Sequence, residues 1–183
     1  MQREALAALD LGPEDRFLDV GCGPGATLRR LADSIRFGVG VDLSPEMVRI
    51  GRDLANQLEG VEFCVADSER LPFRDGEFTA LLCSTSFHHY PNPAEAARQM
   101  ARVLAPGGRL VLADPCSDLV AARIADVFLR RFEPGHVRLH RSAELGGFVQ
   151  SAGLQRVRLR RLSSGGYAIV HGVNPGGDFP PAR

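Results

Sequence analysis

A glycine-rich turn between a short apolar run and a helical segment constrains the fold of this chain most strongly. Residues 16–20 are apolar enough for a buried strand, residues 21–25 read Gly-Cys-Gly-Pro-Gly, and residues 26–32 place leucines on one helical face. The sequence therefore predicts a strand–turn–helix unit. In such a unit the glycines let the backbone approach a ligand, and the start of the helix turns free N–H groups toward it.

Apolar strands and helical segments alternate along the rest of the chain. Short apolar strands separated by helices are typical of a parallel sheet that is covered on both faces. The sequence predicts an α/β fold with a doubly wound, mostly parallel seven-stranded sheet that ends in a C-terminal antiparallel hairpin. We expect strands at 16–20, 37–43, 61–65, 78–83, 109–113, 154–162 and 166–173, helices at 2–9, 26–32, 45–58, 93–104, 119–131 and 142–152, and a turn at 106–108.

Length and charge limit the class of protein. The 183 residues favour one domain, which we place at 1–173, followed by a disordered tail at 174–183. The 22 basic residues are all Arg and balance 22 acidic residues, which argues against nucleic-acid binding and a membrane surface. No apolar leader or membrane-length run is present, so we expect a cytoplasmic location. The arginine-rich run at 156–161 is expected to be an edge strand that deters sheet pairing.

Three acidic residues stand at or near the ends of the first three strands. Asp42 lies about 20 residues beyond the glycine turn, the position from which a carboxylate accepts hydrogen bonds from ribose hydroxyls. Asp19 precedes the glycines, and Asp67 follows the third strand, where it can accept from an exocyclic amine of adenine. The glycine spacing alone also fits a dinucleotide. The three carboxylates, together with the missing Lys, favour a positively charged ligand over a nicotinamide cofactor.

Several segments resemble one known family. Residues 18–25 (Leu-Asp-Val-Gly-Cys-Gly-Pro-Gly), 40–44 (Gly-Val-Asp-Leu-Ser) and 66–67 (Ala-Asp) are similar to the successive motifs of class I S-adenosylmethionine-dependent methyltransferases. The chain most resembles the small-molecule type related to quinone-biosynthesis methyltransferases, and the pieces at 71–73, 87–89 and 103–108 agree. The resemblance implies a Rossmann-like fold and S-adenosyl-L-methionine as cofactor.

The resemblance also implies roles for individual positions. Asp19 and the glycines serve the methionine end of the cofactor, and Asp42 with Leu43 serves the ribose and the adenine. Asp67 with Ser68 serves the adenine edge, while Cys83 borders the sulfonium. The complete expected cofactor set is Asp19, Gly21, Gly23, Gly25, Asp42, Leu43, Met47, Asp67, Ser68 and Cys83.

Histidines and aromatic residues after the fourth strand are the candidates for the acceptor side. Methyl transfer from a sulfonium is an in-line displacement, so alignment supplies much of the acceleration and no metal is expected. Where the acceptor must lose a proton, His88 and His89 are the candidate bases, with a packing role as the alternative. The candidate lining of the acceptor pocket is Phe87, Tyr90, His136 and His140.

The sequence leaves two functions open. The first is methyl transfer to a small organic acceptor, with the choice among oxygen, nitrogen and carbon unresolved. The second is a non-catalytic scaffold or regulatory subunit that binds S-adenosylmethionine without turnover. Few residues precede the first strand, so the site is expected to be open, and a homodimer could complete it.

Overall fold

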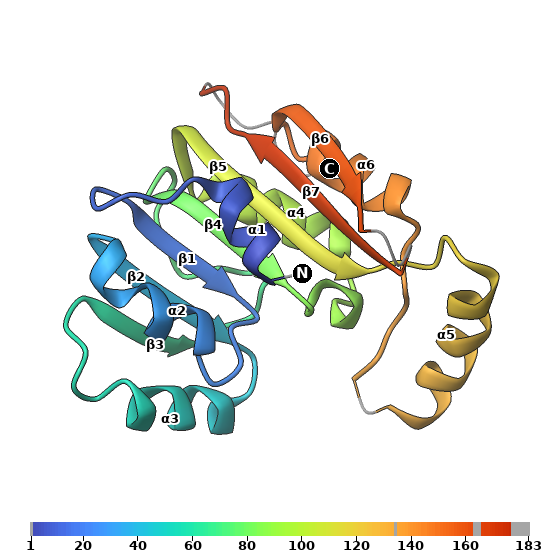
Figure 1. Cartoon of the computed structure of the whole chain (residues 1–183), viewed down its shortest axis with the longest axis horizontal. Coiled ribbons are helices and arrows are strands. Elements are labelled where there is room, and N and C mark those ends of the chain that lie inside the picture. Colours follow the sequence, from blue (N-terminus) through green and yellow to red (C-terminus); the bar gives the residue numbers. More distant parts are fainter. Residues whose placement is uncertain (1, 134, 163–165, 177–183) are drawn as a thin grey trace.

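The chain forms one seven-stranded sheet (Figure 1). The computed structural model describes residues 2–133, 135–162 and 166–176. The strand order is β3-β2-β1-β4-β5-β7-β6, in which the first five strands along the chain are parallel and β7 runs antiparallel to both β5 and β6. This arrangement confirms the predicted fold class. The strands are β1 (Arg16–Val20), β2 (Phe37–Asp42), β3 (Val61–Val65), β4 (Phe78–Ser84), β5 (Leu104–Pro115), β6 (Gln155–Arg161) and β7 (Tyr167–Val173).

Helices cover both faces of the sheet. One hydrophobic cluster joins α1, α2 and α3 to one face, and a second joins α4 and α6 to the other. Helix α5 stands apart from both layers, beyond the end of β5 and the start of β7 (Figure 1). The α-helices are α1 (Gln2–Leu9), α2 (Ala26–Leu31), α3 (Pro45–Leu54), α4 (Pro93–Arg102), α5 (Val120–Phe132) and α6 (Ser142–Ser151), with short 3₁₀ segments η1 (Ala32–Ser34) and η2 (Phe87–His89).

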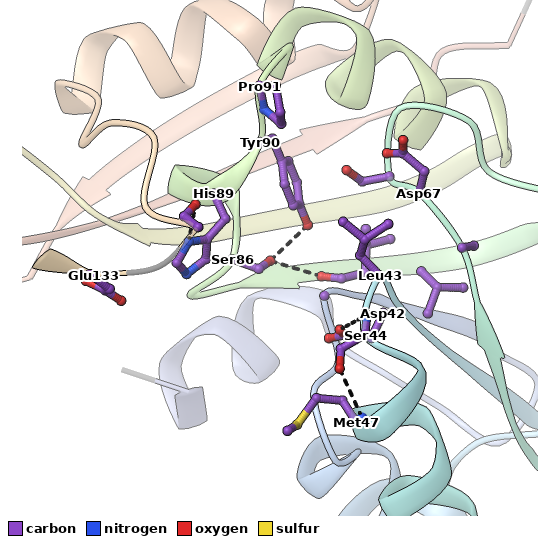
Figure 2. Close-up of a pocket in the computed structure, with 16 residues that line it drawn as sticks. Asp42, Leu43, Ser44, Met47, Asp67, Ser86, His89, Tyr90, Pro91 and Glu133 are labelled. Atoms are coloured by element: carbon purple, nitrogen blue, oxygen red, sulfur yellow. Dashed lines mark hydrogen bonds between the residues drawn. The ribbon is translucent and has the colours of Figure 1, made fainter. Parts of the chain in front are cut away.

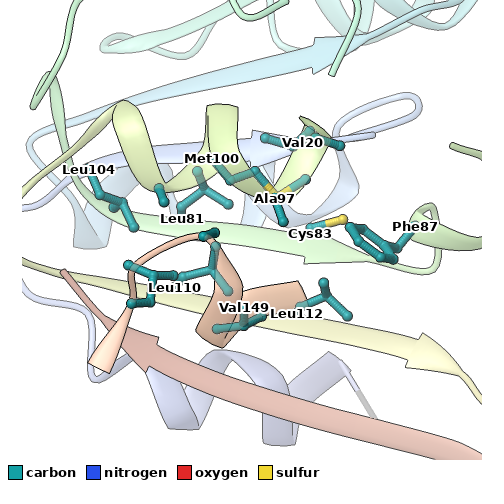
Figure 3. Packing of buried hydrophobic residues seen from close by; sticks show 14 of the residues in the cluster. Val20, Leu81, Cys83, Phe87, Ala97, Met100, Leu104, Leu110, Leu112 and Val149 are labelled. Atoms are coloured by element: carbon teal, nitrogen blue, oxygen red, sulfur yellow. The ribbon is translucent and has the colours of Figure 1, made fainter. Parts of the chain in front are cut away.

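The interior of the α4 and α6 side is built on the central strand β4 (Figure 3). Leu81 is fully buried and packs in the cluster that also holds Met100 of α4 and Val149 of α6. Fully burying a side chain of this size contributes about 1.5–3 kcal/mol to stability, so this layer fixes the central strands firmly. The strand ends that carry the functional side chains therefore stand on a rigid base.

Two helices begin with a side-chain cap. Ser44 is the N-cap of α3, where its Oγ accepts from Met47 N at 3.3 Å, and Pro45 takes the first helical position. Asn92 caps α4 in the same way by accepting from Glu95 N at 3.2 Å. These caps fix where both helices leave the sheet.

The largest errors among the predicted boundaries are at the end of α3 and the start of β5, and the helix predicted at 93–104 also ends early, at Arg102. Helix α3 ends at Leu54 instead of residue 58, because the chain turns there and Leu58 N donates back to Ala55 O at 2.9 Å. Strand β5 begins at Leu104 instead of residue 109, and the predicted turn at 106–108 is a bulge inside the strand. Leu104 pairs with Phe78 and Arg109 pairs with Ala80, so the residues between Leu104 and Arg109 bulge out of the pairing between β4 and β5.

The predicted tail begins too early. Asn174 is buried, and its side-chain amide donates to Leu104 O at 2.6 Å. Its backbone N also donates to Gly108 O at 2.9 Å, which ties the end of β7 to the bulge of β5. The rest of the predicted tail, from residue 177 onward, lies outside the described residues.

The two outer elements differ in character. Strand β6 lies at the edge of the sheet, as its arginine-rich sequence predicts. Helix α5 exposes a stripe of large apolar side chains at helical spacing: Val120, Ile124, Val127, Phe128 and Phe132. Within the described part of the chain, no helix has the length and apolar character needed to span a membrane.

Candidate active site

A cavity of about 760 Å³ opens at the carboxyl ends of the parallel strands (Figure 2). This is the edge at which open α/β sheets bind their ligands. One end of the cavity is formed by the residues that follow β1, β2 and β3. The other end is formed by η2 and the segment after α5. The lining comprises Val20, Gly21, Val41, Asp42, Leu43, Ser44, Met47, Ala66, Asp67, Ser68, Ser86, His89, Tyr90, Pro91, Glu133 and Gly135.

The three glycines of the turn differ in what a side chain at each position would contact. All three adopt positive φ, from 52° to 72°. A Cβ on Gly21 would lie 2.3 Å from Ser86 Oγ, and a Cβ on Gly25 would lie 2.3 Å from the Phe63 ring, so packing within the protein requires both glycines. A Cβ on Gly23 would meet nothing within 4 Å. Only at Gly23 does the missing side chain leave open space beside the turn.

Asp42 is held in place by backbone amides on both sides of the site. Its Oδ2 accepts from Gly23 N at 2.8 Å, and its Oδ1 accepts from Ser44 N at 2.9 Å. Each carboxylate oxygen keeps a further lone pair, and the residue lines the cavity. The carboxylate is therefore fixed before any ligand arrives and can accept from two neighbouring hydroxyls.

The residues beside Asp42 form a surface for a flat ring. Leu43 is 72% exposed although it is large and apolar, and it lines the cavity together with Met47. Across from them, Asp67 Oδ1 accepts from Glu69 N at 2.8 Å, and Ser68 is adjacent. Apolar side chains with a carboxylate at their edge match the face and the exocyclic amine of an adenine.

Asp19 lies behind the cavity instead of on its wall. It is 3% exposed, and burial raises the pKa of its carboxyl to about 7 against a hydrogen bond from Thr27, with the nearby Asp42 raising the pKa further. A positive charge placed near the glycine turn would favour the ionised form of this carboxyl. A cationic ligand would therefore interact favourably with the carboxylate of Asp19.

A hydroxyl cluster joins the two ends of the cavity. Ser86 Oγ donates to Val20 O at 3.2 Å and lies 3.0 Å from Tyr90 Oη (Figure 2). Cys83 Sγ contacts both, at 3.3 Å from Ser86 Oγ and 3.6 Å from Tyr90 Oη. Burial raises the pKa of the Cys83 thiol to about 12 and holds the pKa of Tyr90 well above its usual range. These groups are neutral hydrogen-bonding groups at neutral pH.

The predicted histidines occupy different depths. His89 lines the cavity, and its Nδ1 donates to Gly135 O at 2.9 Å. His88 is buried and turns its Nδ1 to both carboxylate oxygens of Asp114, each at 3.1 Å. His140 is buried against the rings of Phe87 and Phe148, and burial lowers its pKa.

The cavity brings together some of the predicted residues and not others. Those that line it are Gly21, Asp42, Leu43, Met47, Asp67, Ser68, His89 and Tyr90. Those that lie outside the lining are Asp19, Gly23, Gly25, Cys83, Phe87, His88, His136 and His140.

Three residues of the acceptor side were missed in the sequence. Ser86 follows β4 without any motif, and Asp114 is a fully buried carboxylate near the end of β5. Glu133 follows α5, and nothing local in the sequence marks it as facing His89. A carboxylate inside the otherwise apolar run of β5 was the one signal that could have drawn attention to Asp114.

Comparisons with known proteins show the family of the chain. Residues 18–112 match the model of a methyltransferase domain. An uncharacterized methyltransferase of Bacillus subtilis, YcgJ, is 34% identical over 129 residues, and the crystal structure of YcgJ superposes with a TM-score of 0.82 over 96% of this chain and 100% of that chain, at 21% identity. A demethylmenaquinone methyltransferase of Clavibacter sepedonicus is 30% identical over 92% of this chain and 77% of its own length. The chain belongs to the class I S-adenosylmethionine-dependent methyltransferases.

The chain covers only part of some relatives. It spans 51% of the length of the Bacillus relative and 39% of an uncharacterized 37.1 kDa transposon protein of Streptomyces fradiae, to which it is 36% identical over 135 residues. The chain therefore spans about half the length or less of these two relatives.

The residues present fit the cofactor of this family. Asp42 offers two fixed acceptor oxygens, Leu43 offers an exposed apolar face, and Gly23 leaves open space beside the turn. The cofactor is S-adenosyl-L-methionine, as the sequence predicts.

Proposed function

We propose that this chain transfers the methyl group of S-adenosylmethionine to a small organic acceptor. The observation that carries the proposal is one continuous cavity, which has Asp42, Leu43 and Asp67 at one end and His89, Tyr90 and Glu133 at the other. Ser86 and Tyr90 lie at the junction beside Gly21. A cofactor laid along the strand ends would point its reactive group toward the second end.

When bound, S-adenosylmethionine supplies an electrophilic methyl group on its sulfonium. The protein has to hold the acceptor in line with that methyl group, exclude competing water and receive any proton that the acceptor loses. Besides Tyr90, the side chains at the acceptor end that can accept a proton are the imidazole of His89 and the carboxylate of Glu133. His88, by contrast, is buried outside the lining, which favours a supporting role for it.

Two measurements test this proposal in order. We expect S-adenosylmethionine and S-adenosylhomocysteine to bind with one-to-one stoichiometry in calorimetric titrations, and NADH not to bind. We then expect S-adenosylhomocysteine to accumulate when a suitable acceptor is added. The printed activity of the Clavibacter relative makes demethylmenaquinone the first acceptor to assay, followed by phenols, amines and carbon acids.

The outcomes separate the two functions that the sequence leaves open. Cofactor binding with turnover supports the enzyme. Cofactor binding without turnover on any acceptor class supports the scaffold, and the absence of cofactor binding contradicts both.

A further inference from the structure

We propose that three histidines and a glutamate at the acceptor end form a binding site for a divalent transition metal: His88, His89, His136 and Glu133. The ligand atoms of His88, His89 and Glu133 lie within 4.8 Å of one another. His136 adjoins them, with its Nδ1 3.9 Å from Glu133 Oε2 and its ring centroid 5.4 Å from that of His88. Imidazole nitrogens with one carboxylate form a donor set that suits Zn²⁺ and its neighbours.

Hydrogen bonds assign the tautomers of the first two histidines. The Nδ1 of His88 faces the carboxylate of Asp114, and the Nδ1 of His89 faces the carbonyl oxygen of Gly135. Both oxygens only accept hydrogen bonds, so in each neutral ring the proton sits on Nδ1 and Nε2 keeps its lone pair. A histidine that donates one ring N–H to an oxygen and offers the other nitrogen is the usual arrangement of a metal ligand.

The third histidine shows the same arrangement with its ring reversed. His136 Nε2 lies 2.8 Å from Asp126 Oδ1, so Nε2 carries the proton and Nδ1 keeps the lone pair. The side chain of His136 is 1% exposed, and its Nδ1 is buried with no hydrogen-bond partner. A buried polar atom without a partner costs about 1–3 kcal/mol, and a metal ion beside Glu133 would remove that cost.

Backbone hydrogen bonds hold the two ligand-bearing segments together. His88 O accepts from both Val137 N and Arg138 N at 3.1 Å, which docks the segment after α5 onto η2. Within that segment His136 N donates to Glu133 O at 3.2 Å, and this turn brings both side chains to the same side. The site is therefore assembled by the fold, although its residues come from distant parts of the sequence.

The spacing of the ligands is close to what a metal requires. Ligand atoms about 2.0–2.1 Å from a tetrahedral Zn²⁺ are roughly 3.3 Å apart, so the ligand atoms of His88, His89 and Glu133 must approach one another by up to about 1.5 Å. The side chain of Glu133 is 43% exposed and can make that movement by rotating its torsions. His89 and Glu133 also line the cofactor cavity, so an ion held there would face the acceptor.

No metal is predicted from the sequence, because the proposed ligands do not form a sequence motif. Metal motifs are recognised by ligands at short, regular spacings. Here the adjacent pair His88 and His89 is completed by Glu133 and His136 from beyond α5, together with orienting carboxylates from two further positions.

The test is a metal titration of the full chain after treatment with a chelator. Zn²⁺ is titrated in competition with a chromophoric chelator, and Co²⁺ is added separately to record its absorption spectrum. We expect one equivalent of Zn²⁺ to bind, and a Co²⁺ spectrum without a thiolate charge-transfer band, since the ligands are nitrogen and oxygen. His89→Gln and Glu133→Gln should each weaken Zn²⁺ binding by at least ~10-fold.

Matched controls keep the test decisive. His171→Gln on β7 and Glu59→Gln before β3 replace the same residue types outside the cluster, and neither should change the affinity for Zn²⁺. Each variant is first required to bind S-adenosylhomocysteine, which shows that it is folded. The proposal is overturned if Zn²⁺ binds equally well to the cluster variants, if no equivalent binds, or if the Co²⁺ spectrum shows thiolate ligation by one of the four free cysteines.

Discussion

The two ends of the cavity are built in different ways. At the cofactor end, Asp42 is fixed by backbone amides of the loops after β1 and β2, and Asp67 is fixed by an amide of its own loop between β3 and β4. At the acceptor end, His89 is fixed by Gly135, and the two belong to segments separated by α4, β5 and α5. The contacts that fix Asp42 and Asp67 therefore join residues at most 19 positions apart, whereas the contact of His89 with Gly135 joins residues 46 positions apart.

The strongest test of this difference is Asp42→Ala, which should weaken S-adenosylhomocysteine binding about 1,000-fold. The substitution removes a charged acceptor for two ribose hydroxyls, each worth about 1.5–3 kcal/mol, and it also releases Gly23 N and Ser44 N. Calorimetric titration measures the change. Asp53→Ala is the matched control, because Asp53 is an exposed acid on α3 that pairs with Arg49. Equal losses in both variants would contradict the assignment of Asp42.

The same difference explains how far the sequence could predict the site. Asp42 and Asp67 can be identified from the sequence because each stands at or near the end of a predicted strand, and the carboxyl ends of parallel strands form the ligand-binding edge of the sheet. Glu133 was not identified, because its place depends on how α5 leaves β5 and how the following segment docks on His88. Sequence patterns report periodicity and capping, and neither gives the approach of two distant segments.

The same difference separates the parts of the fold that the sequence predicts from the part that it does not. Most of the seven strands can be predicted because they are apolar and bounded by turn residues, whereas β6 is predicted from the alternation of arginines with apolar residues. The bulge at 105–108 was missed because its glycines read as a turn, and only the pairing of Leu104 with Phe78 and the contacts of Asn174 keep these residues in the sheet. Tertiary hydrogen bonds decided the conformation there.

The next largest effect is expected at the other end of the cavity. His89→Gln should lower kcat about 100-fold and leave S-adenosylhomocysteine affinity within twofold, because His89 lines the acceptor end only. Single-turnover assays with a saturating acceptor measure the rate, and titration measures the affinity. A loss of cofactor affinity comparable to the loss of rate would show that the two ends are not separable.

A smaller effect on stability is expected behind the cofactor end. Burial raises the pKa of Asp19 to about 7 from an ordinary value of 3.8. The folded state therefore resists ionisation of this carboxyl, so its contribution to the free energy of unfolding is complete below about pH 4 and is lost as the pH rises through about 7. Asp19→Asn should remove that loss.

The test compares the free energy of unfolding of Asp19→Asn with that of the natural chain. At pH 8 the cofactor-free variant should be more stable than the natural chain by about 1–2 kcal/mol, since the buried amide offsets part of the gain. At pH 4 the variant should have no such advantage. Denaturant unfolding at both pH values measures this, and identical pH profiles for the two proteins would mean that Asp19 does not carry the shift.

The smallest effect in this series is expected at Leu43, and it tests whether the cofactor end recognises a ring face as well as hydroxyls. Leu43 is 72% exposed in the structure without ligand, so Leu43→Ala removes little packing from the fold. If an adenine covers this side chain, its loss should cost about 1.5 kcal/mol of binding, or roughly tenfold in affinity, with unchanged thermal stability. Leu54→Ala is the control, because Leu54 is 55% exposed at the end of α3 and lies outside the cavity lining. Unchanged affinity for S-adenosylhomocysteine in Leu43→Ala would place the adenine elsewhere and leave Asp42 as the main determinant of binding at this end.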